Sequence, residues 1–99
     1  MEELKLALKV NDLDNVATIF ATGLTAGTEV EMRDKKGHTE RMTILSDIPY
    51  GHKIAIRDLK KGEPVIKYGE ELGATTADIR KGEHVHVHNM DSMRGRGDL

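Results

Sequence analysis

Three histidines alternate with two valines between residues 82 and 90. Neutral imidazole is the commonest metal ligand in proteins, and it also transfers protons near neutral pH. A period of two predicts a β-strand with the imidazoles on one face and the valines on the other. Because valine favours strands and burial, we expect the valine face to point into a core and the histidine face to be solvated or to line a site. The histidines are His84, His86 and His88, and the valines are Val85 and Val87.

The histidine spacing is compatible with a metal site but does not identify one. Alternate Cα atoms of a strand lie roughly 6.5–7 Å apart, so two imidazoles could share an ion if other ligands came from elsewhere. The sequence has no cysteine and no His-Glu-x-x-His motif, which excludes a thiolate site and gives no specific zinc signature. Three alternatives stay open: a metal held within this chain, imidazoles that line a site completed by another chain, and a solvent-facing strand.

Two other positions could bind a ligand. His52 follows the sequence Pro-Tyr-Gly, a break where the backbone can approach a ligand, although an ordinary loop histidine is the alternative. Lys67 precedes Tyr68 at the end of an apolar run, where a lysine can bind a carboxylate or a sulfonate as a point charge. Its alternative is a solvated edge-strand lysine that discourages sheet pairing. The sequence shows no pair of nucleophile and base.

The composition favours one small domain that binds neither nucleic acid nor a membrane surface. The chain has 99 residues and a formal net charge of −2 at pH 7, without a basic stripe. No apolar run approaches membrane-spanning length, and the first residues lack the pattern of a secretory signal. Together with the absence of cysteine, these features predict a cytoplasmic protein.

The apolar pattern predicts a mostly β domain. Its segments are short, several alternate between apolar and polar residues, and polar turn residues separate them. Asp34 to Gly37 resembles a hairpin loop between two of the segments. The predicted strands and apolar segments cover residues 4–10, 16–21, 29–33, 38–45, 52–56, 65–69 and 84–88.

One template occurs three times in the sequence: an aliphatic residue, a glycine three positions later and a valine three positions after the glycine. The copies are unequally spaced, which excludes a solenoid of fixed period. We interpret each copy as a corner, in which a short helical turn buries the aliphatic residue, glycine supplies a permissive backbone and a new strand begins at the valine. The copies are Leu24–Val30, Leu59–Val65 and Ile79–Val85.

Several blocks together resemble the N-terminal SAF domain of the altronate dehydratase family. The resemblance extends to the small subunit of sulfolactate sulfo-lyase and to the front of galactarate dehydratase, and it covers roughly residues 10–90 in chain order. The Gly-His-Lys, Ile-Lys-Tyr-Gly and Glu-His-Val-His-Val-His-Asn blocks are specific as a set. The blocks lie at residues 14–17, 51–55, 58–63, 65–69 and 82–89.

The resemblance implies a β-clip fold, which is a small, strongly bent and mostly antiparallel β domain. The predicted corners agree with such a bent shape. It also implies part of a carbon–oxygen lyase that removes water from a sugar acid, with most of the catalytic machinery in a large partner subunit or domain. Because the sequence stops soon after the histidine stretch, we expect a single domain over residues 1–99, with a flexible tail over residues 91–99. This domain is either a separate small subunit, which the C-terminal sequence favours, or a fragment of a longer protein.

The resemblance also implies site residues. Elimination beside a carboxylate needs a base for the α-proton and an acid for the leaving hydroxyl. A divalent metal, iron or manganese, held mainly by the partner chain, would suit imidazole and carboxylate ligands. The catalytic candidates are His52, His86 and His88; the substrate-binding candidates are Lys53, Lys67, Tyr68 and Asn89; and the metal-ligand candidates are His84, His86 and His88.

Three alternative functions stay open. Nothing in these residues separates a hydroxyl from a sulfonate leaving group, so the small subunit of a sulfolactate sulfo-lyase is one alternative. A stand-alone SAF module that binds a carbohydrate or a protein is the second. The third is a small metal-binding protein, which would lose its ion as the imidazoles become protonated near their usual pKa of about 6.5.

Overall fold

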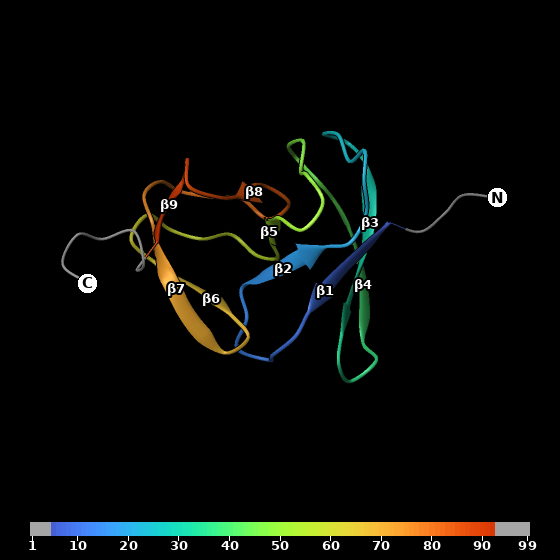
Figure 1. Cartoon of the computed structure of the whole chain (residues 1–99), viewed down its shortest axis with the longest axis horizontal. Helices are drawn as coiled ribbons and strands as arrows, with labels where there is room; N and C mark the ends of the chain where they lie inside the picture. The colour runs from blue at the N-terminus through green and yellow to red at the C-terminus, as the bar shows by residue number, and fades with distance from the viewer. Residues whose placement is uncertain (1–4, 93–99) are drawn as a thin grey trace.

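A computed structural model describes residues 5–92 of the chain, and these residues form nine β-strands joined by turns and loops (Figure 1). The described range contains no helix, and so no helix of membrane-spanning length and hydrophobicity. The prediction of a mostly β domain is therefore confirmed. The strands are β1 (Leu6–Lys9), β2 (Val16–Ile19), β3 (Glu29–Asp34), β4 (Thr39–Thr43), β5 (Lys53–Ala55), β6 (Pro64–Lys67), β7 (Glu70–Thr75), β8 (His84–Val85) and β9 (Met90–Ser92).

The larger sheet contains six strands in the order β4-β3-β1-β2-β5-β8. Its neighbouring strands are antiparallel, except that β1 and β3 are parallel. The register of β5 and β8 places Ile54 opposite His84 and Lys53 opposite Val85. This pairing brings the histidine stretch beside the segment that contains His52, although His84 follows His52 by 32 positions in the sequence.

The smaller sheet has the order β6-β7-β9, and it lies on the opposite side of the molecule from β3 and β4 (Figure 1). Asn15 links it to the larger sheet, because its Nδ2 donates to the carbonyl of Pro64 and its Oδ1 accepts from the amide of Ile66, both at 2.8 Å. The apolar pattern predicted β6 but neither β7 nor β9.

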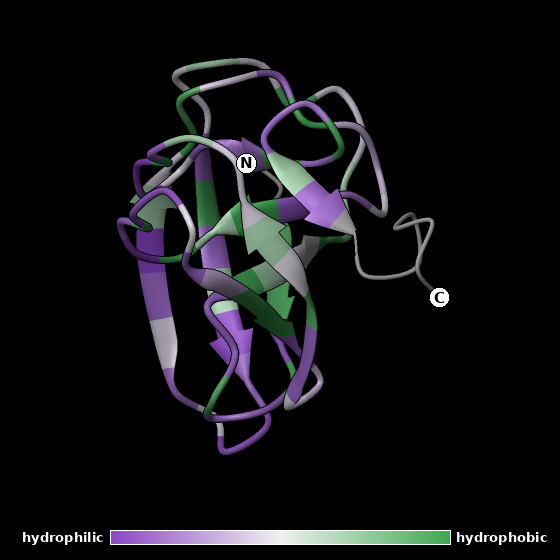
Figure 2. Ribbon diagram, turned by 90° about the vertical axis from the view of Figure 1, so that its left-hand side faces the viewer, coloured by the Kyte–Doolittle hydropathy of each residue, from purple (hydrophilic) through white to green (hydrophobic). Residues whose placement is uncertain are grey.

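The hydrophobic core has two parts, and β2 contributes to both of them. Successive residues of a strand point to opposite faces, so Ala17 and Ile19 enter one cluster and Val16 enters the other. Figure 2 shows the apolar strands at the centre and hydrophilic segments around them. The three aromatic residues of the chain stay outside both clusters with 41–57% of their surfaces exposed, so aliphatic residues and methionine build the core.

The repeated template forms corners of one design. In each copy the aliphatic residue and the valine are at most 3% exposed. The glycine between them has a φ of +90° to +96° and donates its amide to another strand or segment. The glycines are Gly27, Gly62 and Gly82, and their amides bind the carbonyls of Ile44, Thr75 and Ala55. These corners bend the chain sharply between strands, as the β-clip prediction requires.

Two details of the corner prediction need correction. The corners are β-turns with the glycine third, where a positive φ is required, and not short helical turns. A fourth corner runs from Ile48 to Ile54 around Gly51, whose φ is +82°. The template missed this copy because isoleucine stands where the other copies have valine. The corners pair by isolated bridges, Leu24 with Ile48 and Leu59 with Ile79.

Candidate functional site

The histidine stretch is a strand only at its beginning. β8 ends at Val85, which is fully buried, and the chain then turns so that Val87 is 71% exposed. The prediction of one strand with both valines in the core is therefore wrong beyond Val85. Asn89 explains the turn: its Oδ1 accepts from the amide of His86 at 3.0 Å, and its Nδ2 donates to the carbonyl of His84 at 2.8 Å. The buried amide group thus holds the backbone in a loop.

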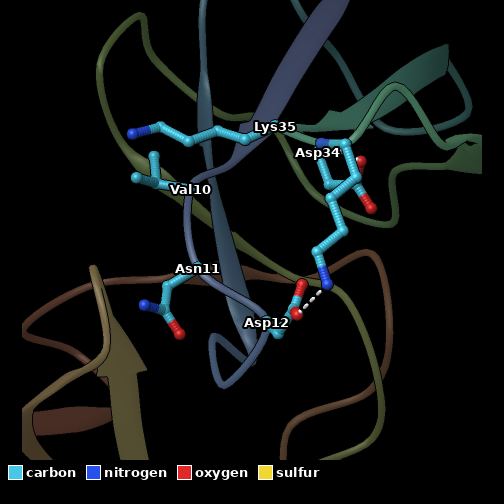
Figure 3. A pocket seen from close by; sticks show the side chains of 6 residues that line it. Val10, Asn11, Asp12, Asp34 and Lys35 are labelled. Carbon is cyan, nitrogen blue, oxygen red and sulfur yellow. Dashed lines mark hydrogen bonds and ion pairs between the residues drawn. The ribbon is translucent and has the colours of Figure 1, made fainter.

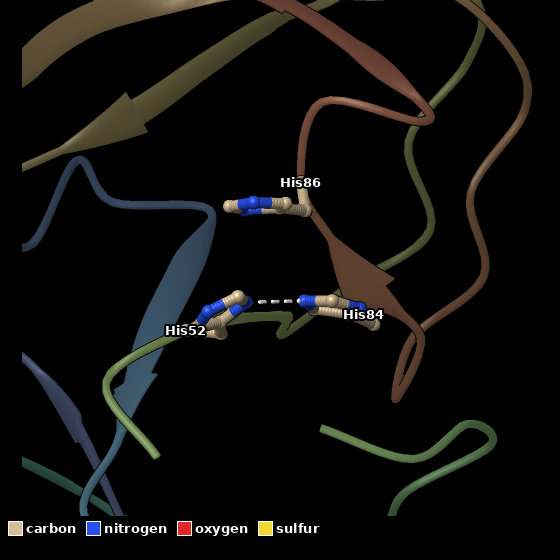
Figure 4. A group of neighbouring side chains, drawn as sticks. All are labelled: His52, His84 and His86. Atoms are coloured by element: carbon tan, nitrogen blue, oxygen red, sulfur yellow. Dashed lines mark hydrogen bonds between the residues drawn. The ribbon is translucent and has the colours of Figure 1, made fainter. Parts of the chain in front are cut away.

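The imidazoles nevertheless gather on one side of the molecule. Nδ1 of His52 lies 2.9 Å from Nε2 of His84, so one ring donates a hydrogen bond to the other (Figure 4). The ring of His86 stacks on that of His52, with 4.4 Å between the ring centroids. His88 is exposed, and its ring centroid lies 5.2 Å from that of His84. We call His52, His84 and His86 the histidine cluster.

The fourth corner positions His52 in this cluster. Its amide donates to the carbonyl of Pro49 at 3.1 Å, and its carbonyl accepts from the amide of Ile19 in β2 at 2.9 Å. On the other strand, the amide of His84 donates to Oγ of Ser46 at 2.9 Å. Hydrogen bonds therefore hold the backbone of His52 and that of His84, and the two rings meet where β5 and β8 pair.

The electrostatic environment favours the neutral form of two of the rings, those of His84 and His86. Burial is the largest cause that lowers the pKa of His84, to about 4, and the basic groups of His52, His88, His86 and Lys53 lower it further. Burial and the charges of His52, Lys53 and His88 also lower the pKa of His86. Each of these rings has an unprotonated nitrogen near neutral pH, which can accept a proton or bind a metal ion.

Lys53 borders the cluster, and Lys67 lies near Lys53. Lys53 is half-buried, and burial, followed by the positive charge of Lys67, lowers its pKa. Lys67 ends β6, and its Nζ lies 4.9 Å from the ring centroid of Tyr68. None of the ion pairs within the described residues includes either lysine. The region around the cluster therefore favours an anionic ligand.

The tip of the β6–β7 hairpin is held by a residue that sequence analysis did not name as a site residue. Tyr68 and Gly69 have φ angles of +57° and +76°, as a two-residue hairpin turn requires. The amide of Gly69 donates to Oδ1 of the buried Asp14 at 2.8 Å. Asp14 was visible only as part of a polar turn cluster and of a resemblance block, and neither signal gives its contact with Gly69.

The nitrogen atoms of the histidine cluster satisfy the simplest requirement of a metal site. One ring nitrogen from each of His52, His84 and His86 lies within 4.8 Å of the others. Two nitrogens bound to one ion at about 2.1 Å lie roughly 3–4 Å apart, so a small movement of the rings would suffice. Imidazole ligands suit iron, manganese and zinc, and the lowered pKa values of His84 and His86 keep those two rings free to bind. The residues present therefore fit the metal that the resemblance implies.

A shallow cleft of about 380 Å³ adjoins the cluster. His84 lies on its wall together with Leu24, Ile48 and Pro49 from two of the corners. A second cleft, of about 260 Å³, lies between the β1–β2 loop and the β3–β4 hairpin, where Lys36 and Asp12 form an ion pair at 2.5 Å (Figure 3). The charges of Lys36 and Asp12 are paired and exposed there, so the cleft beside His84 is the better candidate for a ligand.

The remaining predicted residues are placed as follows. Asn89 is 8% exposed and both ends of its amide bind backbone groups of the histidine turn. Tyr68 is 54% exposed at the hairpin tip. Asp91 and Ser92 of the predicted tail belong to β9, while residues 93–99 lie outside the described range.

Comparison with known proteins agrees with these observations. The chain is 44% identical over 82 residues to the altronate dehydratase of Escherichia coli (strain K12), a match that covers 83% of this chain but only 15% of that enzyme. It is 41% identical over 88 residues to the (2R)-sulfolactate sulfo-lyase subunit alpha of Chromohalobacter salexigens, a match that covers 86% of this chain and 93% of that subunit. The galactarate dehydratase (L-threo-forming) of E. coli is 34% identical over 79% of this chain and 14% of its own length.

One family model covers the whole described range. The family called altronate/galactarate dehydratase SAF domain matches residues 5–93. The match includes all nine strands and every residue of the histidine cluster. The chain therefore belongs to the SAF domain family of altronate and galactarate dehydratases.

Proposed function

We propose that this chain forms one wall of the active site of a sugar-acid dehydratase and that a larger catalytic chain or domain completes the site. The observation that carries this proposal is the histidine cluster next to Lys53, with Lys67 nearby and no acidic ion-pair partner for either lysine among the described residues. Such a surface can bind an acid and exchange protons with it. The shallow cleft beside His84 agrees with a site that needs a second surface.

The proposed reaction removes a proton from the carbon next to a carboxylate and a hydroxyl from the following carbon. An unprotonated imidazole of His52 or His86 can accept that proton, and the same group or His88 can return a proton to the leaving hydroxyl. His84 serves mainly to orient His52 through the 2.9 Å hydrogen bond. Asn89 positions the turn, because its amide binds the backbone of His84 and His86.

The substrate carboxylate is assigned to the basic side of the site. Lys53 and Lys67 can hold it as point charges, and the exposed Tyr68 beside Lys67 can donate a hydrogen bond to a substrate hydroxyl. These contacts would place the α-carbon toward the imidazoles that flank Lys53.

We further propose that the histidine cluster helps to hold a divalent ion, iron or manganese, together with ligands from the larger partner. When bound, such an ion stabilises negative charge on the oxygen atoms of the substrate. With the ion bound, His52 and His84 would each give it one ring nitrogen in place of their hydrogen bond, and His86 would remain free to accept the proton. A cytoplasmic location is part of the proposal and is supported by the absence of cysteine.

A sulfo-lyase is the second candidate. It is favoured by the alignment to a sulfo-lyase alpha subunit over 93% of that subunit, whereas the dehydratases are matched over a small part of their length. A sulfonate is an anion, and the same basic side of the site could bind it as it leaves. The wall of histidines and lysines would then serve an elimination of sulfite instead of water.

Reconstitution tests the proposal and chooses between the two reactions. The tagged chain is purified with the large chain that binds it stoichiometrically. Consumption of altronate, or release of sulfite from sulfolactate, is then measured. We expect one substrate to be converted only by the complex. The His52→Ala and His86→Ala variants should lose most of this turnover, while His38→Ala should retain it, because His38 pairs with Asp34 on the β3–β4 hairpin.

Two outcomes would overturn the proposal. One is a complex in which His52→Ala and His86→Ala turn over substrate at the unaltered rate. The other is a chain that stays alone and binds a carbohydrate or a protein by itself, as the stand-alone SAF module would.

A further inference from the structure

A buried hydroxyl group on the central strand has no partner. Thr18 lies in β2 with 6% of its surface exposed, and its Oγ1 is the single buried side-chain polar atom among the described residues without a hydrogen-bond partner. Buried hydroxyl groups in proteins are almost always hydrogen-bonded, because an unpaired one weakens folding. Such an exception calls for a ligand or a functional explanation.

The residue directly opposite Thr18 is Lys53. The antiparallel register of β2 and β5 pairs the two residues, and directly opposite residues project from the same face of a sheet. On the other side of Lys53, the register pairs it with Val85 of β8. Thr18 and Lys53 therefore lie side by side across β2 and β5, and Val85, on the far side of Lys53, directly precedes His86.

The charged groups that act on Lys53 are positive. Lys67 is close enough to lower the pKa of Lys53, and Lys53 in turn lowers the pKa of both His84 and His86. No ion pair of the described residues neutralises Lys53 or Lys67. A half-buried lysine without an acidic partner, next to a hydroxyl that can donate a hydrogen bond, is complementary to an oxyanion.

We propose that Thr18 and Lys53 form a subsite for one carboxylate group of the substrate, with Lys67 as a second cation. The Thr18 hydroxyl donates a hydrogen bond to one carboxylate oxygen, and the Lys53 ammonium group binds the other. Oγ1 of Thr18 is closed to solvent, so the flexible side chain of Lys53 moves aside to admit the anion. The identification of this anion as the substrate rests on the proposed function, whereas the chemistry of the subsite rests on the two residues.

Titration of the full 99-residue chain with glycolate tests the subsite without any catalytic partner. Glycolate is the smallest 2-hydroxy acid, and its binding is followed by the shifts of backbone amide resonances. We expect saturable shifts centred on Thr18, Lys53 and their strand neighbours. The Thr18→Val variant should bind at least about tenfold more weakly, because it loses a hydrogen bond to a charged group. Lys53→Met should show no saturable binding.

Matched controls come from the outer strand and its hairpin. Thr39→Val and Lys35→Met make the same chemical changes at exposed positions in β4 and in the hairpin loop, and both should bind glycolate like the unaltered chain. Thr18→Val should also raise the melting temperature of the ligand-free chain, since valine has nearly the same shape and no unpaired hydroxyl. This combination of higher stability and weaker binding is specific to a hydroxyl that serves a ligand.

Two results would overturn the subsite. In one, Thr18→Val binds glycolate normally and melts at a lower temperature, which would make the hydroxyl a structural group. In the other, glycolate shifts the amides of other regions only. Failure of the proposed function looks different, since the chain would then bind glycolate through Thr18 and Lys53 while no reconstituted complex converts altronate or sulfolactate.

Discussion

His52 directly precedes β5 and His84 begins β8, 32 positions later in the sequence, yet their rings share a hydrogen bond of 2.9 Å. The contact exists because β5 pairs with β8 and because the glycine of each corner, Gly51 or Gly82, lies one or two residues ahead of its histidine. A hydrogen bond between two imidazoles requires at least one unprotonated nitrogen that accepts it. The pair is therefore sensitive to protonation, and this sensitivity gives the first prediction.

The first prediction concerns the pH at which His84 becomes charged. Burial and the neighbouring basic groups of His52, His86, His88 and Lys53 lower its pKa to about 4. In the chelator-treated chain, an NMR titration of the ring resonances of His84 should therefore have its midpoint near pH 4. A midpoint near the usual value of about 6.5 would show that the ring is solvated and that the cluster does not form.

The same shift predicts how stability depends on pH. Between about pH 6.5 and pH 4 the unfolded chain binds a proton at His84 that the folded chain does not bind, so folding stability should fall as the pH falls through this window. Chemical unfolding at pH 7, 6 and 5 measures the effect. His84→Gln should show a flatter dependence over this range, and an unchanged slope would assign the effect to other groups.

The second prediction concerns metal binding by the chain alone. One nitrogen from each of His52, His84 and His86 lies within 4.8 Å of the others, so the chain should bind Zn²⁺ more tightly than Mn²⁺, in the usual order of affinities. Isothermal titration calorimetry at pH 7.5 measures both. Loss of one of three ligands in His52→Ala should weaken Zn²⁺ binding by at least about tenfold.

His38→Ala is the control for this measurement. His38 is exposed and pairs with Asp34 at 2.9 Å on the β3–β4 hairpin, outside the histidine cluster. Its removal should leave the affinity for Zn²⁺ unchanged. Equal affinities of the unaltered chain and His52→Ala would show that the histidine cluster does not bind the ion.

Local patterns predicted much of the fold because the corners repeat. The aliphatic–glycine–valine template located three of the four corners, alternation located β1 and β3, and apolar segments located β4 and β6. β7 was missed because its residues, Glu-Glu-Leu-Gly-Ala-Thr, contain few strand-forming side chains. Its strand conformation comes from pairing with β6 and β9, which no local pattern contains.

The candidate site was predictable in its residues but less so in its geometry. Alternation identified three imidazoles on one side, but the turn after Val85 depends on the two backbone contacts of Asn89, which a period of two does not reveal. The meeting of His52 with His84 depends on the pairing of β5 and β8. Thr18 was invisible because an ordinary threonine in an apolar run becomes notable only when its hydroxyl is found without a partner.

The third prediction concerns the glycine that precedes the histidine strand. Gly82 has a φ of +96°, and a Cβ at this position would collide with the carbonyl oxygen of Thr43. Gly82→Ala should therefore destabilise the fold by more than the roughly 1–2 kcal/mol that the left-handed conformation alone costs. Urea unfolding measures the loss, and amide shifts should show that β8 moves away from β4.

Gly62 provides the matched control for this substitution. Its φ is +90°, but a Cβ there would meet no atom within 4 Å. Gly62→Ala should cost only the conformational term of roughly 1–2 kcal/mol. Equal losses in the two variants would show that the approach of Gly82 to Thr43 is less close than the structure has it.

The fourth prediction separates the observed turn from the strand that alternation suggests. Val85 is fully buried among the residues of the second core cluster, while Val87 is 71% exposed. Val85→Ala should lower the free energy of unfolding by about 1.5–3 kcal/mol, because it removes two buried carbon groups and leaves a cavity. Val87→Ala should change it by less than about 0.5 kcal/mol, as exposed substitutions usually do.

Urea unfolding of both variants decides between the two conformations. A continuous strand from His84 to His88 would place both valines on one buried face, and the two losses would then be similar. The turn held by Asn89 predicts a large difference between them. The same turn brings the ring of His86 over that of His52. Equal losses of unfolding free energy in the two variants would therefore also contradict the stacking of these two rings.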